Sequence, residues 1–350
     1  MKKVFVALSG GVDSSVVAHK LQNDGWDVTA VFIRVWQPDF IPCTQNEEER
    51  AAMRVAAHLG IPFRRLDLSA EYKRDVVDTM ISEYRAGRTP NPDVLCNTSI
   101  KFGAFLKYAQ KNGVTTIATG HHARVEQENG MFNLLRGRDA SKDQAYFLWT
   151  LSQEELHHTL MPVGTMTKAE VREYANEHNL PSAYKPDSQG LCFIGHVDMK
   201  TFLKHFITTK PGDVIDEEGH VVGTHDGAEL MTLGQRGGFT ITEKNAHRDI
   251  YYVVGKDLEK NTITVSPHID TSSQANTTFA LTNTNIISKP LSEKSYTCEI
   301  RYHGEPIPCT ITQNEGEYSV VTLTHPVLVA PGQSIVFYDG NLCLGGGIVV

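Results

Sequence analysis

The chain has 350 residues, of which 40% are hydrophobic and 21% are charged, and its formal net charge at pH 7 is −8. This composition is typical of a globular protein, and the length exceeds one ordinary hydrophobic core, so we expect two or three domains. No window approaches the length of a membrane span, and the apolar stretch after Met1-Lys2-Lys3 is too short for a signal peptide. We therefore expect a cytoplasmic protein that does not contact a membrane.

The first half alternates strand-like and helix-like segments. Strands are predicted at Lys3–Leu8, Asp27–Ile33, Phe63–Leu68 and Val114–Thr119, and helices at Ser14–Asn23, Glu47–Leu59, Ala70–Ala86 and Ile100–Lys111. This alternation predicts an α/β fold with a parallel sheet covered by helices on both faces. Ligands bind beyond the carboxyl ends of such strands, where both the loop after the first strand and Gly120-His121-His122 are expected.

The loop Ser9-Gly10-Gly11-Val12-Asp13-Ser14-Ser15 joins the first strand to the first helix. Its glycines let the backbone approach a charged ligand, and the N–H groups of the helix start can point at that ligand. The loop lacks the third glycine of a dinucleotide fingerprint and the Gly-Lys-Ser/Thr of a Walker A motif. It resembles the pyrophosphate loop of enzymes that cleave ATP between the α and β phosphates, although Ser-Gly-Gly alone is also common at helix starts.

A second candidate site is the segment Arg88–Asn97, in which Pro90 and Pro92 flank Asn91. The two prolines stiffen the loop, and a helical turn that starts at Asp93 would place Asp93 and Cys96 on the same side. A thiol near a helix start can react, and a neighbouring carboxylate can transfer a proton. The same residues also suit an ordinary turn and cap beside a buried cysteine.

The segment Arg85–Lys142 holds nine Lys and Arg against four Asp and Glu, although the whole chain is acidic. This local surplus would suit phosphate binding, and it also suits a solvated helix face. None of the six cysteines forms a Cys-x-x-Cys pair, so we expect no zinc or iron–sulfur site of that type and no disulfide scaffold.

Beyond residue 140 the pattern changes. A helix is predicted at Lys168–His178, followed by a loop that leads to Cys192, whose neighbours Leu191, Phe193 and Ile194 would equally suit a core strand. Short strands with turns follow from about residue 208, and four later strands, at Tyr296–Tyr302, Tyr318–Leu323, Ser334–Tyr338 and Leu342–Val350, suggest a small barrel. We predict domains at 1–199, 200–270 and 271–350.

Taken in order, these segments resemble the tRNA-specific 2-thiouridylases of the MnmA (TrmU) family along nearly the whole chain. The resemblance includes the glycine loop and five other strings: Ala86–Asn97, Ile117–His121, Lys142–Gln144, Cys192–Gly195 and Thr232–Arg236. It extends to Arg301-Tyr302 and to Pro331-Gly332-Gln333. It implies a pyrophosphate-loop ATPase domain, similar to adenine nucleotide alpha hydrolases, followed by a small, mostly β central domain and a C-terminal β-barrel that contacts tRNA.

The resemblance also implies a reaction: the enzyme adenylates the C2 oxygen of the wobble uridine, position 34 of tRNA, and replaces that oxygen with sulfur. It implies ATP and Mg²⁺ as cofactors and tRNA as partner, with lysine, glutamate and glutamine tRNAs as substrates. Sulfur would come from a cysteine desulfurase or a sulfur-relay protein.

Residue roles follow from the resemblance by matching position. ATP would contact Ala7, Leu8, Ser9, Gly10, Gly11, Val12, Asp13, Ser14, Ile33 and Gly120. Asn91, Pro92 and Asp93 would hold the target base, with Asp93 as general acid or base. Cys192 would carry a persulfide that Cys96 resolves through a transient disulfide. The tRNA would touch His121, Lys142, Asp143, Gln144, Arg301, Tyr302 and Gln333.

Three alternatives share parts of this pattern. Another pyrophosphate-loop enzyme that ligates or amidates a small metabolite would need no paired thiols. A nucleotide-sensing RNA-binding adaptor would bind tRNA without releasing AMP. The same chemistry on another base would give, for example, 4-thiouridine.

Overall fold

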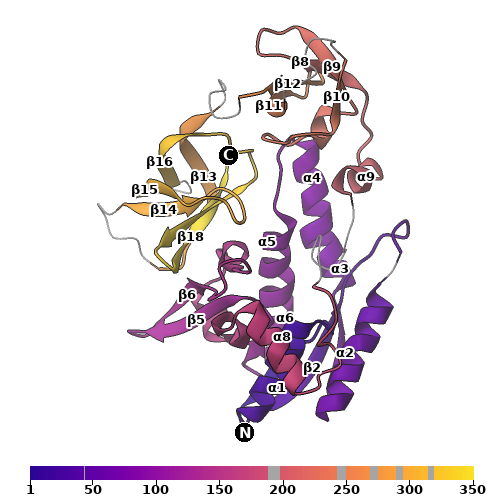
Figure 1. Ribbon diagram of the computed structural model, residues 1–350, viewed down its shortest axis with the longest axis vertical. Coiled ribbons are helices and arrows are strands. Elements are labelled where there is room, and N and C mark those ends of the chain that lie inside the picture. Colours follow the sequence, from indigo (N-terminus) through magenta and orange to yellow (C-terminus); the bar gives the residue numbers. More distant parts are fainter. Residues whose placement is uncertain (43, 188–197, 243–249, 269–274, 289–294, 314–318) are drawn as a thin grey trace.

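The computed structural model describes residues 1–42, 44–187, 198–242, 250–268, 275–288, 295–313 and 319–350 (Figure 1). Three sheets organise these residues. In Figure 1 the parallel sheet and its helices form the lower part, and the barrel and the small middle sheet lie above them, with the end of α4 reaching the middle sheet. Within the described ranges, no helix combines the length and apolar character that a membrane crossing requires.

The first sheet is parallel, with strand order β3-β2-β1-β4-β7. Its strands are β1 (Lys3–Ala7), β2 (Asp27–Arg34), β3 (Phe63–Asp67), β4 (Ile117–Ala118) and β7 (Thr159–Leu160). Its helices are α1 (Val12–Asn23), α2 (Gln45–Leu59), α3 (Ser69–Tyr72), α4 (Thr79–Arg85), α5 (Pro92–Cys96), α6 (Phe105–Lys111), α7 (Gln153–His157) and α8 (Lys168–Glu177). π-Helical segments, Lys73–Asp78 and Asn97–Ala104, join α3 to α4 and α5 to α6, and 3₁₀ turns span Ala145–Leu148 and Pro162–Thr165.

Both faces of this sheet are covered, because successive strand side chains point to opposite sides. Val4 and Val6 of β1 pack into a core with residues of α1, α2 and α8. Phe5, which lies between them, packs into the other core with residues of α4, α5 and α6. The predicted doubly covered parallel sheet is confirmed.

The middle sheet has strand order β10-β9-β8-β12-β11 and a small core of its own. It contains β8 (Gly212–Ile215), β9 (Val221–His225), β10 (Phe239–Ile241), β11 (Tyr252–Asp257) and β12 (Thr262–Ser266), with a 3₁₀ turn at Ala228–Leu230. The helix α9 (Met199–Lys204) precedes it.

The C-terminal barrel closes because β13 pairs with both β16 and β18. Its strands are β13 (Asn276–Ile286), β14 (Tyr296–Glu299), β15 (Ile307–Gln313), β16 (Ser319–Val327), β17 (Ser334–Asp339) and β18 (Leu342–Val349). A hairpin from the first half, β5 (Ala123–Glu128) and β6 (Met131–Arg136), extends this sheet through Leu134 and Leu135, which pair with Cys343 and Leu342. The predicted barrel is confirmed, and the division into 1–199, 200–270 and 271–350 stays a prediction.

Candidate ATP and base-binding site

The loop between β1 and α1 is shaped by its own hydroxyl groups. Ser14 Oγ accepts the Ser9 N–H at 3.3 Å, and Ser15 Oγ donates to the Gly11 carbonyl at 2.7 Å. Gly10 has φ +75°, and a Cβ on it would lie 2.7 Å from the backbone nitrogen of Ala52 in α2, so this position requires glycine. Gly11 caps α1 without a side chain, which lets the first-turn N–H groups point at an anion.

The structure brings Gly120 against this loop. A Cβ on Gly120 would lie 2.9 Å from the Ser14 nitrogen and 3.0 Å from Asp13 Cβ. The loops after β1 and β4 therefore meet at the carboxyl edge of the sheet, where parallel α/β sheets bind ligands. Ala7 ends β1 and is half-buried, Leu8 and Val12 are buried on either side of the glycine pair, and Ile33 is buried near the end of the neighbouring strand β2.

Asp13 lies at the centre of a network of ion pairs. Lys168 Nζ is 2.7 and 2.8 Å from the two carboxylate oxygens of Asp13, and His122 Nε2 is 3.1 Å from Oδ1. Burial alone would raise the pKa of Asp13, but the His122 hydrogen bond and the Lys168 charge outweigh it and lower the pKa below its usual value. Asp13 is therefore ionised at neutral pH.

The network continues from Lys168 to Asp187. Lys168 Nζ lies 2.9 Å from Asp187 Oδ1, and Asp187 also pairs with Arg172 at 2.5 Å and with Lys142 at 3.2 Å. Lys168 is the first residue of α8, whose start is fixed by a capping box between Thr167 and Glu170. Three cations thus surround two carboxylates beside the glycine loop.

A different arrangement holds Asp93 and Cys96. Asn91 caps α5, because its Oδ1 accepts the N–H groups of Asp93 at 3.1 Å and Val94 at 3.2 Å. Pro92 occupies the first helical position, which suits its missing N–H. Asp93 is half-buried in the first turn, and Cys96, one turn later, is 0% exposed. The predicted helical turn therefore exists and carries both residues.

The barrel brings Tyr302 to this turn. Its ring lies 4.4 Å from the Phe147 ring and stacks on His303 at 3.9 Å, both measured between centroids. Burial raises the pKa of Tyr302 to about 12, and the charges of Asp143, Glu299 and Asp93 add to the shift. An aromatic side chain that is still 36% exposed therefore lies within electrostatic reach of Asp93.

Several residues that the resemblance assigns to tRNA already make contacts within the protein. His121 is only 7% exposed, and burial, aided by the Lys101 charge, holds its pKa well below the usual value. The Asp143 carboxylate pairs with Arg136 at 3.0 Å and accepts the Gly137 N–H at 2.8 Å. Gln144 Oε1 accepts the His122 N–H at 2.9 Å.

The remaining members of that set lie nearer to solvent. Lys142 is exposed along part of its side chain, and Arg301 is exposed in the turn after β14. Gln333 is half-buried, and its amide donates to the Thr89 carbonyl at 2.7 Å. Cys192 lies outside the described residues, as do its neighbours from 188 to 197.

Sequence reasoning did not find His122, Lys168 or Asp187 as partners of the glycine loop. Lys168 is 155 positions from Asp13, and no local pattern marks that distance. His122 directly follows the predicted pair Gly120-His121, so its place in the string Gly-His-His was the one available signal.

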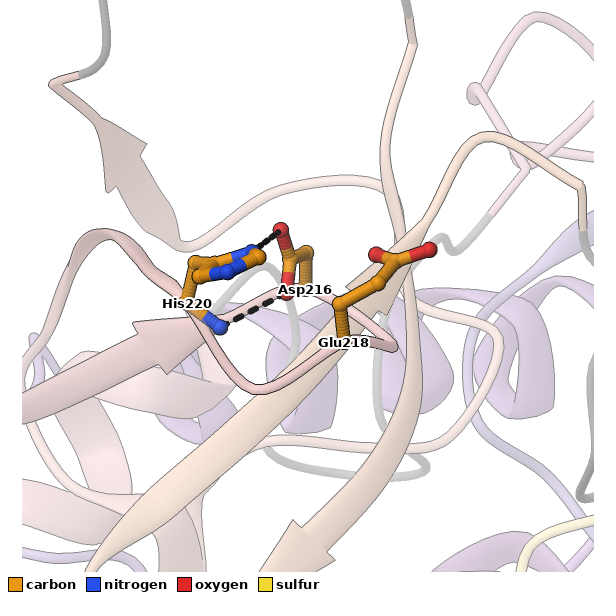
Figure 2. A group of neighbouring side chains, drawn as sticks. All are labelled: Asp216, Glu218 and His220. Carbon is orange, nitrogen blue, oxygen red and sulfur yellow. Dashed lines mark hydrogen bonds and ion pairs between the residues drawn. The ribbon is translucent and has the colours of Figure 1, made fainter.

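One group of possible metal ligands lies elsewhere, in the turn between β8 and β9. Figure 2 shows Asp216, Glu218 and His220, whose ligand atoms lie within 4.8 Å of one another. Asp216 accepts the His220 N–H at 2.8 Å and lies 3.1 Å from His220 Nδ1. These are the hydrogen bonds of an exposed hairpin turn, and they explain the cluster without an ion.

Three family models match the chain in order. Residues 2–196 match the tRNA methyl transferase HUP domain, residues 200–267 match the tRNA methyl transferase PRC-barrel domain, and residues 276–349 match the aminomethyltransferase beta-barrel domain.

Full-length relatives decide the family. The tRNA-specific 2-thiouridylase MnmA 1 of Geobacillus kaustophilus is 43% identical over 353 residues, which cover 99% of this chain and 95% of that protein. The chain belongs to the MnmA family of tRNA-specific 2-thiouridylases. MnmA of Nitrosomonas europaea is 40% identical, with 99% and 98% of the two chains covered, and MnmA of Haemophilus ducreyi is 42% identical, with 99% and 92% covered. The MnmA resemblance of the sequence motifs is confirmed.

Proposed function

We propose that this chain uses ATP to replace the C2 oxygen of the wobble uridine, position 34 of tRNA, with sulfur. The observation that carries the proposal is the match of 99% of the chain to 2-thiouridylases at 40–43% identity. As a member of that family the protein is a tRNA 2-thiouridylase. The particular uridine, the activation step and the residue roles below are our proposals.

The glycine loop is proposed to hold the phosphates of ATP. The first-turn N–H groups of α1 face the anion, and the proposed contacts are Ala7–Ser14, Ile33 and Gly120. Lys168 neutralises Asp13 and His122 hydrogen-bonds it, so the loop presents less negative charge to the phosphates. Mg²⁺ is proposed to enter with ATP and to neutralise phosphate charge. Both Asp13 oxygens already lie within 2.8 Å of Lys168 Nζ, so the ion would be held chiefly by the phosphates.

Asn91, Pro92 and Asp93 are proposed to hold the target base. A wobble base must leave its stack to enter a pocket, and a capped helix start between two prolines supplies a rigid wall for it. The half-buried Asp93 carboxylate is proposed as the general acid or base at the uridine. Tyr302, His121, Lys142, Asp143, Gln144, Arg301 and Gln333 stay the proposed tRNA contacts.

The proposed reaction has two stages. In the first, the C2 oxygen attacks the α-phosphorus and pyrophosphate leaves, which makes the oxygen part of a good leaving group. In the second, the terminal sulfur of a Cys192 persulfide attacks C2. Cys96 then attacks the Cys192 sulfur, so a Cys96–Cys192 disulfide forms, sulfur stays on C2, and AMP leaves with the former C2 oxygen.

The sulfur and the substrate come from partners. A cysteine desulfurase or a sulfur-relay protein is proposed to load Cys192, and lysine, glutamate and glutamine tRNAs are the proposed substrates. We propose that the protein grips tRNA by shape and a few local contacts, since its overall net charge is −8.

The test is a reaction with ATP, Mg²⁺, a persulfide donor and unmodified tRNA, followed by nucleoside analysis by mass spectrometry. We expect 2-thiouridine with the wild-type protein and none with Cys192→Ser. The variant Cys343→Ser is the matched control, because Cys343 is buried in the barrel at β18. A tRNA that stays unmodified, or full activity of Cys192→Ser, would overturn the proposal.

A further inference from the structure

Thr89 is the residue at which all three parts of the chain meet. It lies in the loop between α4 and α5, only 6% exposed. Its backbone contacts the C-terminal part, and its side chain contacts the middle part. The sequence strings Ala86–Asn97, Thr232–Arg236 and Pro331–Gln333 all converge there.

The C-terminal part uses both backbone polar groups of Thr89. The Thr89 N–H donates to the Pro331 carbonyl at 2.7 Å, and the Thr89 carbonyl accepts from Gln333 Nε2 at 2.7 Å. Gly332 lies between these two contacts with φ +91°, and a Cβ on it would lie 3.0 Å from the Thr89 backbone. Because residue 332 is a glycine, the backbone of segment 331–333 can approach the Thr89 backbone closely.

The middle part holds the Thr89 side chain. Thr89 Oγ1 lies 3.1 Å from Thr232 Oγ1, and the Thr232 N–H donates to Gln235 Oε1 at 3.0 Å. Gly87 supports the same contact, because a Cβ on it would lie 2.8 Å from Leu258 Cδ1. The proposed chemistry gives the string Thr232–Arg236 no role. The structure shows that this string binds the Thr89 side chain.

A short and rigid segment connects Thr89 to the proposed base pocket. Asn91, the cap of α5, follows two residues later, and Pro90 and Pro92 fix the backbone on either side of it. A shift of Thr89 therefore moves Asn91 and the turn that carries Asp93 and Cys96. A misplacement of about 1 Å is enough to slow a reaction about a hundredfold when it reaches the reacting groups.

We propose that Thr89 is a positioning residue through which the middle and C-terminal parts set the position of α5 for thiolation. Thr232 and Gln333 act on the reaction through Thr89. The inference rests on the proposed function, since α5 carries the residues proposed for base binding and sulfur transfer.

The test is a double-mutant cycle with Thr89→Val and Thr232→Val in the full-length protein. Valine keeps the shape of threonine and removes the hydroxyl. We expect Thr89→Val to lower kcat for 2-thiouridine formation about fivefold, which is the value of one neutral hydrogen bond, with KM for tRNA and the melting temperature close to wild type. Thr232 also hydrogen-bonds the Tyr84 hydroxyl, so Thr232→Val should lower kcat by at least that factor. The double variant should lose no more kcat than Thr232→Val alone, rather than the product of the two losses.

Two further variants separate the effect of the hydroxyl group from other effects of the substitutions. Thr232→Ser keeps the hydroxyl and should restore kcat, whereas a purely structural loss of the methyl group would not be rescued. Thr278→Val is the matched control, because Thr278 forms a hydroxyl pair with Thr322 at 3.5 Å on the barrel, away from Thr89, and should leave kcat unchanged.

Gly332→Ala tests the other side of the junction and does not depend on the threonine variants folding, because its Cβ would lie 3.0 Å from the Thr89 backbone and Gly332 is not among the proposed tRNA contacts. We expect kcat to fall while KM for tRNA holds. A rise in KM alone, additive losses in the threonine cycle, or a wild-type kcat in either single threonine variant would overturn the inference. If the wild-type protein itself formed no 2-thiouridine, the proposed function would fail instead, so the two failures are distinguishable.

Discussion

Removal of the Lys168 ammonium is the sharpest test of the charge network around the glycine loop. Lys168 is 12% exposed and bridges Asp13 and Asp187. Lys168→Met keeps most of the apolar stem and leaves Asp13 with His122 as its remaining partner in the network described above. The variant therefore removes the lysine cation that pairs with the Asp13 carboxylate and makes the loop more negative.

The expected loss follows from burial. Removal of one partner of a fully buried ion pair costs roughly 3–5 kcal/mol. Asp13 keeps 29% of its side chain exposed and keeps His122, so we expect about 2 kcal/mol of destabilisation. That corresponds to a melting temperature lower by about 4–8 °C. Repulsion between Asp13 and the phosphates should weaken ATP binding about tenfold, or ~1.4 kcal/mol.

The assays are thermal unfolding and calorimetric titration with ATP. Lys204→Met is the matched control, because Lys204 pairs with Asp226 at 2.9 Å on the surface, where both side chains are more than two-fifths exposed. Such a pair contributes about 0–1 kcal/mol, so the control should melt near the wild-type temperature and bind ATP normally. A Lys168→Met protein with wild-type stability and ATP affinity would refute the reasoning.

Three other predictions concern the loop, the cap and a buried lysine. Gly10→Ala should abolish measurable ATP binding in titrations, because its Cβ would meet Ala52. Gly25 also has a positive φ but faces open space, so Gly25→Ala should bind ATP as wild type does. Equal ATP affinities of the two variants would contradict this prediction. Asn91→Ala should lower single-turnover thiolation about fivefold through the loss of ~1 kcal/mol of capping; equal rates would argue against the cap. Burial lowers the pKa of Lys256 from 10.5 to about 8. Between these pH values the unfolded chain binds more protons than the folded one, so the free energy of unfolding should rise with pH. In urea unfolding Lys256→Met should lack that rise, and a variant with the same pH dependence as wild type would contradict the assignment.

Local signals in the sequence predicted the first sheet well. The prediction of a strand followed by a glycine loop rests on a continuous apolar stretch, Val4–Leu8, and on the residues directly after it, and the structure places a strand, a turn and a helix there. The two long predicted helices at Ala70–Ala86 and Ile100–Lys111 contain π-helical stretches, which no periodicity in so short a run discloses.

Long-range pairing accounts for what the sequence did not predict. The hairpin of β5 and β6 joins the barrel at Leu342 and Cys343, more than two hundred positions away. The sequence did not predict this pairing because the residue pattern of a strand does not specify which strand it pairs with. His121 follows a strand in a Gly-His-His string, which is typical of an exposed ligand-binding loop, yet its ring is buried against Thr119 and Lys101. Ion pairs such as Asp13–Lys168 depend on how α8 packs on α1, which only coordinates provide.

The central claim is that ATP activates the C2 oxygen of the uridine before sulfur replaces it. The most direct measurement uses tRNA with ¹⁸O at C2 of uridine 34 and follows the label by mass spectrometry during thiolation. Our account predicts one ¹⁸O in each AMP released, equal in amount to the 2-thiouridine formed, and none in pyrophosphate. Formation of 2-thiouridine with unlabelled AMP would contradict it.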